Sequence, residues 1–301
     1  MSVQASIVIP SCNRVDELRS LIRSCLNQTV PVEIIVVDDA ANDEVERMIR
    51  VGFSGVRYFR LGRAKGPAFQ RNRGIECATS EIVFPVDDDS LFISPHTVEQ
   101  TLAEFDHPRI GAVGIPYVNI NQDARVLQTA PRDGAIHVTY GFVGAAHAVR
   151  RDVFLKAGGF REHFFYMGEE SDLCLRLLRN GYVTRLGNAD PIHHLESPRR
   201  NLKRAGFSGR CNDIRFAWHN VPLPDFPLHL AGTTWNGFRA ALTQGCFTSM
   251  VRGTAAGYAD LFRRWHERDP VPRRTYRLHR ALKKRSLKLE EIESLLAPSN
   301  P

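Results

Sequence analysis

The sequence predicts an α/β fold with a mainly parallel sheet flanked by helices, followed by a mostly helical C-terminal extension. Two observations lead to this prediction. Strand-like apolar runs alternate with segments of helical periodicity through the first half of the 301 residues, and after Pro198 the composition changes to long helical segments. With 43% hydrophobic residues, the chain also has enough apolar material for a full-sized core.

The first half opens with a βαβ unit. Residues 5–9 form a buried strand, apolar residues recur at helical spacing from Val15 to Leu26, and residues 33–37 form a second strand. The alternation continues with a helix over 43–49, a strand over 56–59, a helix over 67–77 and a strand over 82–86. Because parallel strands end at one edge of a sheet, polar residues that follow them are expected to share a binding site.

The second half is less regular. Residues 140–146 are mostly small and let the backbone approach a ligand closely. A helix is expected to start near Glu169 and to stop at Asn180–Gly181. The other predicted elements are strands over 110–115 and 182–186, a helix over 199–220, a Pro-rich break over 221–227 and a helix with Gly interruptions over 228–266.

The N-terminal residues lack a basic segment, and the apolar run Ile7–Ile9 ends at Pro10, so neither a signal peptide nor a membrane span is expected there. The six cysteines are widely spread without a CxxC pair, which indicates reduced core thiols. A cytoplasmic protein is therefore expected.

The net charge of +7 comes from the C-terminal tail. Between Arg263 and Lys288 there are eleven Lys or Arg residues against Glu267 and Asp269, and the rest of the chain is close to neutral. A nucleic-acid partner is therefore not expected from the charge. The tail fits two structures equally well: an amphipathic helix on an anionic membrane at the inner face, or a solvated helix packed on the domain.

Acidic residues follow two of the predicted strands. Asp38–Asp39 ends one strand, and Asp87, Asp88 and Asp89 follow another. Three adjacent carboxylates at a strand end need a compensating cation to stay ionised, which favours a divalent metal with a phosphorylated ligand; a solvated turn or a helix cap is the alternative.

Five blocks in order resemble the glycosyltransferase family 2 pattern. They are Ile7–Arg14, Ile35–Asp39, Gln70–Gly74, Asp87–Asp89 and Gly168–Arg176. The resemblance covers roughly residues 4 to 200. It implies a GT-A (nucleotide-diphospho-sugar transferase) fold and transfer of a sugar with inversion at the anomeric carbon. It also implies a catalytic domain over 1–197, with a nucleotide-binding half (1–90) and an acceptor-binding half (91–197), ahead of a helical region with a basic tail over 198–301.

The resemblance implies a divalent metal, Mg²⁺ or Mn²⁺, at the DxD positions. Asp89 is the expected direct ligand and Asp87 the second acid. A histidine near position 194 completes the coordination in metal-dependent relatives; His194 is preferred here and His193 is the alternative. Either histidine can instead be a buried polar residue bonded to the backbone.

The donor implied is a nucleotide-diphosphate sugar, with UDP- expected ahead of GDP- or dTDP-. Asp39, or Asp38 and Asp39 jointly, are expected on the base or ribose, although one of them suits a helix N-cap. Arg71 matches the Arg of the family's ARNxG block and is expected near the diphosphate or base. The full donor-binding set is Pro10, Asn13, Arg14, Asp38, Asp39, Arg71, Asp87 and Asp88.

The second acidic cluster is the expected source of the catalytic base. The family's usual text is Glu-Asp-x-Asp with the second acid as base, and this chain carries Glu170 at that position, one methylene longer. Asp172 is the alternative base, and Glu169 is assigned to acceptor contacts. Acids in a first helical turn also complement the helix dipole, which explains at least one of them.

Two other classes of protein are the alternatives to a glycosyltransferase. A nucleotidyltransferase also uses carboxylate-held metal, but it carries a Gly-rich loop after the first strand, where this chain reads Pro10–Arg14 without glycine. A non-catalytic nucleotide-sugar or membrane-binding protein is the other alternative. The acceptor, a peripheral membrane contact through the tail and a homo-oligomer are left open.

Overall fold

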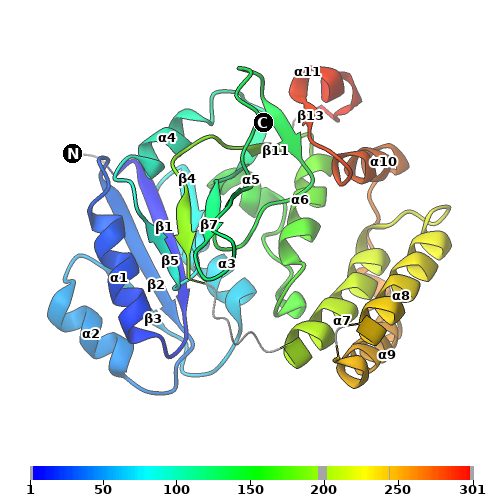
Figure 1. The fold of residues 1–301 in the computed structure, drawn as a ribbon, viewed down its shortest axis with the longest axis horizontal. Helices are drawn as coiled ribbons and strands as arrows, with labels where there is room; N and C mark the ends of the chain where they lie inside the picture. Colours follow the sequence, from blue (N-terminus) through cyan, green and yellow to red (C-terminus); the bar gives the residue numbers. More distant parts are fainter. Residues whose placement is uncertain (1–2, 196–201, 244, 299–301) are drawn as a thin grey trace.

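The computed structural model describes residues 3–195, 202–243 and 245–298, and it contains a large sheet, a small sheet and a helical C-terminal bundle (Figure 1). In spatial order the nine-stranded sheet consists of β13 (Leu287–Lys288), β9 (His137–Thr139), β11 (Val183–Leu186), β6 (Ile110–Gly114), β10 (His147–Arg150), β4 (Ile82–Pro85), β1 (Ala5–Ser11), β2 (Val32–Asp38) and β3 (Arg57–Arg60). The four-stranded sheet consists of β5 (Ser90–Phe92), β12 (Ile192–His194), β7 (Tyr117–Asn119) and β8 (Val126–Leu127).

The helices cover the sheets and form the C-terminal bundle. They are α1 (Val15–Leu26), α2 (Glu44–Gly52), α3 (Pro67–Cys77), α4 (Thr97–Ala103), α5 (Arg151–Lys156), α6 (Glu169–Arg179), α7 (Leu202–Asn220), α8 (Phe226–Thr243), α9 (Phe247–Arg263), α10 (Arg273–Leu282) and α11 (Leu289–Ile292), with the 3₁₀ turns η1 (Glu162–Phe164), η2 (Trp265–Glu267) and η3 (Glu293–Leu295).

The strands β3, β2, β1 and β4 are parallel, as expected for the first half. Alternate residues of β1 pack on opposite sides: Ile7 and Ile9 face α1 and α2, and Val8 faces α3 and α6. Ser11 pairs with Asp38 across β1 and β2, and Val86 donates to the Val8 carbonyl at 3.0 Å. The ends of these strands therefore lie at one edge of the sheet.

The second half of the large sheet is mixed. There β6 and β11 are parallel, whereas β10, β9 and β13 pair antiparallel with their neighbours. The small sheet is important for the site, because β12 lies between β5 and β7 and puts His194 opposite both Ser90 and Asn119.

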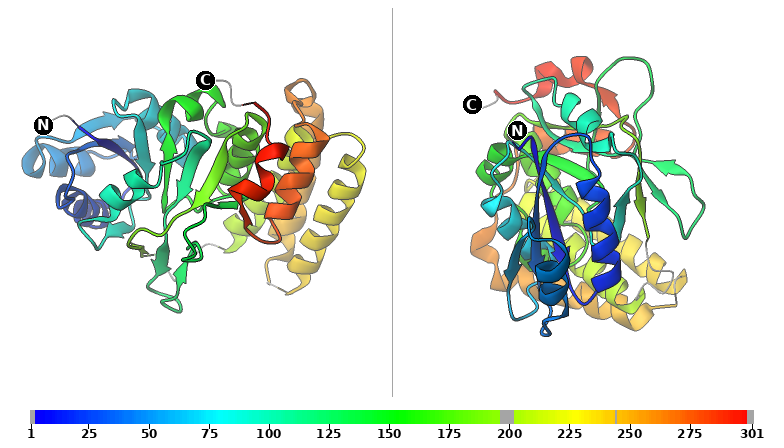
Figure 2. Two further views of the ribbon diagram at one scale, coloured as in Figure 1. Left: turned by 90° about the horizontal axis from the view of Figure 1, so that it is seen from above. Right: turned by 90° about the vertical axis from the view of Figure 1, so that its left-hand side faces the viewer.

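The helical region differs from the expected single helix over 228–266. It forms two helices, α8 and α9, and Gly245 between them has φ +65°, a backbone conformation that glycine adopts without strain. With α7 they stand side by side at the end of the molecule away from the N-terminus (Figure 2).

The basic tail returns to the large sheet. Strand β13 pairs with β9, and Leu278 and Leu282 of α10 share a hydrophobic core with Val138 and Val183. The apolar side of α10 is therefore buried in the fold, as in the second of the two structures considered for the tail, while Arg277 and its cationic neighbours face solvent. The expected domain boundary at 197/198 lies outside the described residues.

The helices were not expected to include a membrane span. Within the described ranges, none combines the length and the apolar character that a bilayer-spanning segment requires.

Candidate functional site

A cavity of about 670 Å³ opens at the edge of the sheet where β1 and β4 end. It brings together nine of the residues singled out in the sequence: Pro10, Arg14, Arg71, Asp87, Asp88, Asp89, Glu169, Glu170 and His194. The other five, Asn13, Asp38, Asp39, Asp172 and His193, do not line it.

Two guanidinium groups compensate the acidic run. Arg14 Nη1 lies 2.9 Å from Asp88 Oδ1 and 2.6 Å from Asp89 Oδ2, and Arg71 Nη2 lies 2.5 Å from Asp87 Oδ1. Burial and the two flanking carboxylates raise the pKa of Asp88 to about 7, with Arg14 opposing them. The expectation that three adjacent acids need a compensating cation is thus met in part by arginine, while burial makes ionisation of Asp88 costly.

Asp87, Asp89 and His194 form a group whose candidate ligand atoms all lie within 4.8 Å of one another. His194 Nδ1 lies 2.9 Å from Asn119 Oδ1, and His194 Nε2 lies 3.4 Å from Asp89 Oδ1. Since an amide oxygen only accepts, Nδ1 carries a proton; in the neutral ring the lone pair is then on Nε2, which faces Asp89, as in a metal-ligating histidine.

The charge of the cavity also fits a divalent cation. Its lining contains five carboxyl groups, from residues 87–89, 169 and 170, against the guanidinium groups of Arg14, Arg71 and Arg204. When all of these groups are ionised, two negative charges are in excess. The residues present therefore suit a hard cation with carboxylate ligands and one imidazole.

Glu169 and Glu170 begin α6 on the other side of the cavity. Glu169 is 3% exposed, and its Oε1 accepts from Arg71 Nη1 at 3.0 Å. Burial raises the pKa of both carboxyl groups, and the proximity of Glu170 adds to the effect on Glu169. A Cβ atom at Gly144 would lie 2.8 Å from Glu170 Oε1 and 2.7 Å from Arg71 Nη2, so the backbone approaches these groups as closely as glycine allows.

Asp172 is one turn further along α6 and fully buried. Its Oδ2 accepts from Arg176 Nη2 at 2.7 Å, and its Oδ1 accepts from Asn220 Nδ2 at 2.7 Å and from Arg161 Nε at 3.2 Å. Burial opposes ionisation, yet these three partners hold the pKa of Asp172 below its ordinary value. The carboxylate links α6 to α7.

Asp38 and Asp39 differ in how many acceptor atoms are used. Asp38 accepts from the Ala40 N–H at 2.9 Å and from the Tyr58 hydroxyl at 2.8 Å, one bond to each oxygen. Asp39 Oδ2 accepts from the N–H groups of Lys65 and Gly66, at 2.9 and 2.8 Å, while its buried Oδ1 has no hydrogen-bond partner. The Asp39 N–H donates to the carbonyl of Ser11, a residue that lines the cavity, at 3.0 Å.

His193 and Asn13 lie apart from the cluster. Side chains alternate along β12, so His193 is directed away from the face that His194 shares with Asn119. Asn13 is exposed, has φ +58°, and lies 3.3 Å from the side chain of Asn42.

Some residues of the site were not identified from the sequence. Asn119 fixes the His194 ring, and its place at the end of a short strand-like run was a usable signal. Arg204 of α7 also lines the cavity, with its guanidinium 5.6 Å from the Phe165 ring and 5.1 Å from the Tyr166 ring. No local motif marks Arg204, because it lies in the helical region beyond the recognisable blocks.

The fold is shared with solved structures, among them a glycosyltransferase complex. A mannosyltransferase from Pyrobaculum calidifontis in complex with GDP-Man and Mn²⁺ superimposes with a TM-score of 0.59 over 97% of this chain and 84% of that chain, at 18% identity. S. aureus TarS 1-349 in complex with UDP gives a TM-score of 0.54 over 87% of this chain and 92% of that chain, at 15% identity. The predicted GT-A fold is confirmed.

Sequence comparison gives the family. The pre-mycofactocin glycosyltransferase of Mycobacterium tuberculosis is 30% identical over 192 residues, which are 58% of this chain and 39% of that protein, so the chain spans about two fifths of this relative. The family model for glycosyl transferase family 2 matches residues 6–158, which include the strand ends that form the cavity. The chain belongs to glycosyl transferase family 2.

Proposed function

We propose that this chain is an active, metal-dependent inverting glycosyltransferase that moves a sugar from a nucleotide-sugar donor to an acceptor hydroxyl. The observation that carries the proposal is the pair of acidic groups in one cavity. Asp87 and Asp89 lie with His194 at the strand ends, Glu169 and Glu170 start α6 opposite them, and Arg71 bonds to both groups. Inverting transfer needs a base on one face of the sugar and charge stabilisation of the leaving group on the other.

Glu170 is the proposed base, and Asp172 is a positioning residue. Glu170 lines the cavity, is half-buried and has a raised pKa, which brings its basicity closer to that needed to accept a proton from a hydroxyl. Asp172 is outside the cavity, and its pKa is lowered by its three partners. Glu169 stays assigned to acceptor contacts, through its second oxygen Oε2, which is buried without a partner.

Asp87, Asp89 and His194 are the proposed ligands of Mg²⁺ or Mn²⁺. A cation bound there supplies Lewis-acid stabilisation for the departing diphosphate. The Mn²⁺ in the structurally similar mannosyltransferase complex supports this part of the proposal. Arg14 and Arg71 are the cationic side chains of the cavity that would contact the same diphosphate.

A UDP-sugar is the proposed donor, with Asp39 on the base or ribose. The unused oxygen Oδ1 of Asp39 can accept from the imide N–H of uracil or from a ribose hydroxyl. Pro10, Asp88 and the nearby Asn13 complete the proposed donor set. The similar structures contain GDP-Man in one case and UDP in the other, so a panel of nucleotides is the direct test.

The test is a thermal-shift panel of UDP, GDP and dTDP with and without Mn²⁺. We expect Mn²⁺-dependent stabilisation that is largest for UDP. Glu170→Gln should keep this stabilisation while losing turnover by at least about 100-fold. Asp89→Asn and His194→Gln should lose the Mn²⁺ dependence, whereas the neighbouring His193→Gln is the matched control. Stabilisation by no nucleotide would exclude the donor site, and full turnover in Glu170→Gln would exclude the base.

We also propose that the enzyme is cytoplasmic and contacts an anionic membrane through a surface on α8 and α9. Leu228, Trp235, Phe238 and Leu242 form a stripe along α8, and the Phe238 ring lies 6.2 Å from that of Phe247 on α9. Leu228 is 81% exposed, Trp235 61% and Leu242 63%. Leu228 also lines a pocket with three cationic residues, Arg277, Arg280 and Lys283. An apolar stripe bordered by cationic side chains suits a membrane with anionic headgroups.

A further inference from the structure

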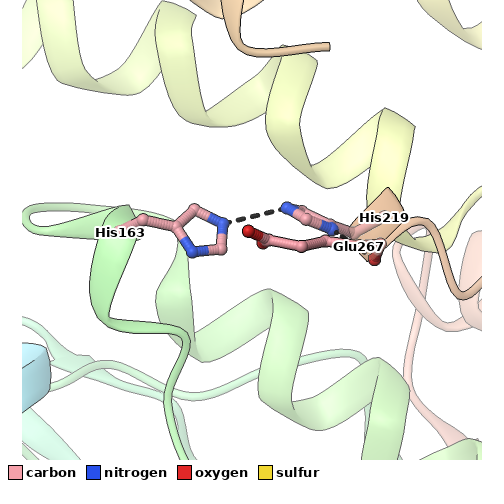
Figure 3. Close-up of side chains that lie close together, drawn as sticks. All are labelled: His163, His219 and Glu267. Atoms are coloured by element: carbon pink, nitrogen blue, oxygen red, sulfur yellow. Dashed lines mark hydrogen bonds between the residues drawn. The ribbon is translucent and has the colours of Figure 1, made fainter. Parts of the chain in front are cut away.

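Two histidines and a glutamate lie close together where η1 packs against the helical bundle (Figure 3). His163 belongs to η1, His219 to α7 and Glu267 to η2. The two imidazole Nε2 atoms are 2.9 Å apart, and the Glu267 carboxylate lies beside them, with the three candidate ligand atoms within 4.8 Å of one another. None of the three residues lines the cavity described above.

The hydrogen bonds around His219 direct a lone pair into this cluster. His219 Nδ1 lies 3.1 Å from the main-chain carbonyl oxygen of Glu267, which can only accept. The proton of the neutral ring is therefore on Nδ1, and Nε2 faces His163 as an acceptor. A backbone carbonyl that fixes the tautomer in this way is typical of histidines that bind metal.

Both rings are neutral and partly or fully removed from solvent. His219 is fully buried and His163 is half-buried. Burial lowers the pKa of both imidazoles, that of His163 to about 3, with further contributions from His219 and neighbouring arginines. In this arrangement His163 donates from Nε2 to His219, so a cation that binds His163 Nε2 requires the proton of that neutral ring to move to Nδ1.

The arginines near the cluster have acidic partners. Arg264 bonds to Glu267 Oε1 at 2.7 Å, Arg215 pairs with Asp260, and Arg161 pairs with Asp172. These carboxylates reduce the positive charge that would repel a bound cation, although Asp172 is shared with Arg176 and Glu267 is itself a proposed ligand.

We propose that His163, His219 and Glu267 form a second divalent-metal site, suited to Zn²⁺, that joins the helical bundle to the catalytic domain. Two imidazoles and one carboxylate are ligands that Zn²⁺ takes in tetrahedral sites, with the fourth position open to water. Ligand nitrogens in such a site are about 3.3 Å apart at Zn–N distances of about 2.0 Å, so the observed 2.9 Å requires only a small rotation of the rings.

The site would fix a segment that forms a wall of the catalytic cavity. The chain runs from His163 through Tyr166 and Met167, which line the cavity, into α6. Asn212 of α7 already donates to the carbonyl groups of Phe164 and Met167, at 3.0 and 2.6 Å. A metal on His163 and His219 would add coordination bonds to the hydrogen bonds that already join this segment to α7.

The experiment uses the full chain carrying Asp89→Asn, so that the strand-end cluster does not contribute metal binding. Co²⁺ is titrated into the chelator-treated protein, and the visible absorption of tetrahedral Co²⁺ is recorded. We expect one equivalent bound, with Zn²⁺ displacing it and raising Tm by roughly 5 °C at a hundredfold excess over Kd. Mg²⁺ should do neither.

Variants locate the site. His163→Gln and Glu267→Gln, added to Asp89→Asn, should each weaken Co²⁺ binding at least tenfold, and both change side chains at the less buried side of the cluster. His229→Gln is the control, because this half-buried ring of α8 bonds to the Tyr276 hydroxyl instead. Absence of tetrahedral Co²⁺ bands in Asp89→Asn, or bands of equal affinity in all the variants, would overturn the proposal.

Discussion

Arg71 connects the two acidic groups of the cavity, and at 3% exposure it does so out of contact with bulk water. One guanidinium therefore pairs with Asp87 and Glu169 together. Removing charge on either side changes the basicity of the acids that remain. The proton affinity of Glu170 is set within this cluster and not by Glu170 alone.

Glu169→Gln should shift the acidic limb of the kcat/KM profile to lower pH. The base must be deprotonated, so activity is lost as pH falls through its raised pKa. The substitution removes the carboxylate that Arg71 shares with Asp87 and so releases Arg71, whose charge lowers the pKa of Glu170, toward Glu170. A pH–rate series on the purified enzyme measures the shift, with the exposed Glu162→Gln as control. A limb that moves to higher pH would exclude Glu170 as the titrating base.

Asp172→Asn should destabilise the protein by about 3–5 kcal/mol, because Arg176 and Arg161 lose the charge that compensates them inside the fold. Since the pKa of Asp172 is lowered in the fold, its stabilising contribution is present at neutral pH and is lost as pH falls through that pKa. Urea unfolding at neutral pH measures the difference. Glu170→Gln serves as comparison and should unfold close to wild type, so equal stability of the two variants would contradict the positioning role.

At the scale of elements, glycines bring α7 and α9 into backbone contact. A Cβ at Gly253 would lie 2.2 Å from the Phe207 carbonyl oxygen, and one at Gly257 would lie 3.0 Å from the Cys211 carbonyl oxygen. By contrast, a Cβ at Gly232 in the middle of α8 meets no atom within 4 Å. The α7–α9 contact therefore depends on the absence of side chains at two positions.

Gly253→Ala should lower the free energy of unfolding by about 1–3 kcal/mol, because the methyl group forces the two helices apart. Gly232→Ala is the matched control and should raise stability by about 0.5–1 kcal/mol through helix propensity. Thermal unfolding followed by circular dichroism compares the two. A Gly253→Ala variant as stable as Gly232→Ala would mean that the helices are not in contact as described.

The parallel half of the fold could be predicted from the sequence because β1, β2 and β4 are apolar runs that are mostly buried, and helices follow β1, β2 and β3. The acids at the strand ends then follow from topology alone. The break at Gly245 could not be placed, because glycines also occur inside α8 and α9. The small sheet that pairs β12 with β7 depends on contacts between residues 75 positions apart, so the end of a strand-like run could mark Asn119 as a polar position but not identify His194 as its partner.

At the scale of the molecule, the tail completes the catalytic domain. Leu289 and Ile292 of α11 and Leu282 of α10 fill the core over β9 and β11. Removing residues beyond 262 would expose that core, so a truncated chain cannot report on membrane contact alone. The appropriate variants change surface side chains and leave the core intact.

Vesicle binding should therefore depend on α8 and α10 together. We expect the protein to sediment with phosphatidylglycerol-containing vesicles and not with pure phosphatidylcholine. Trp235→Ser should weaken binding by removing exposed apolar surface, and Arg277→Gln and Lys283→Gln should each weaken it about fivefold, for roughly 1 kcal/mol per cation near the surface. Val51→Ser, on the exposed face of α2, is the control. Equal vesicle binding by Trp235→Ser and the unchanged protein would contradict a membrane contact through the stripe. A dimer in solution that Trp235→Ser dissociates would assign the stripe to a second copy of the chain instead.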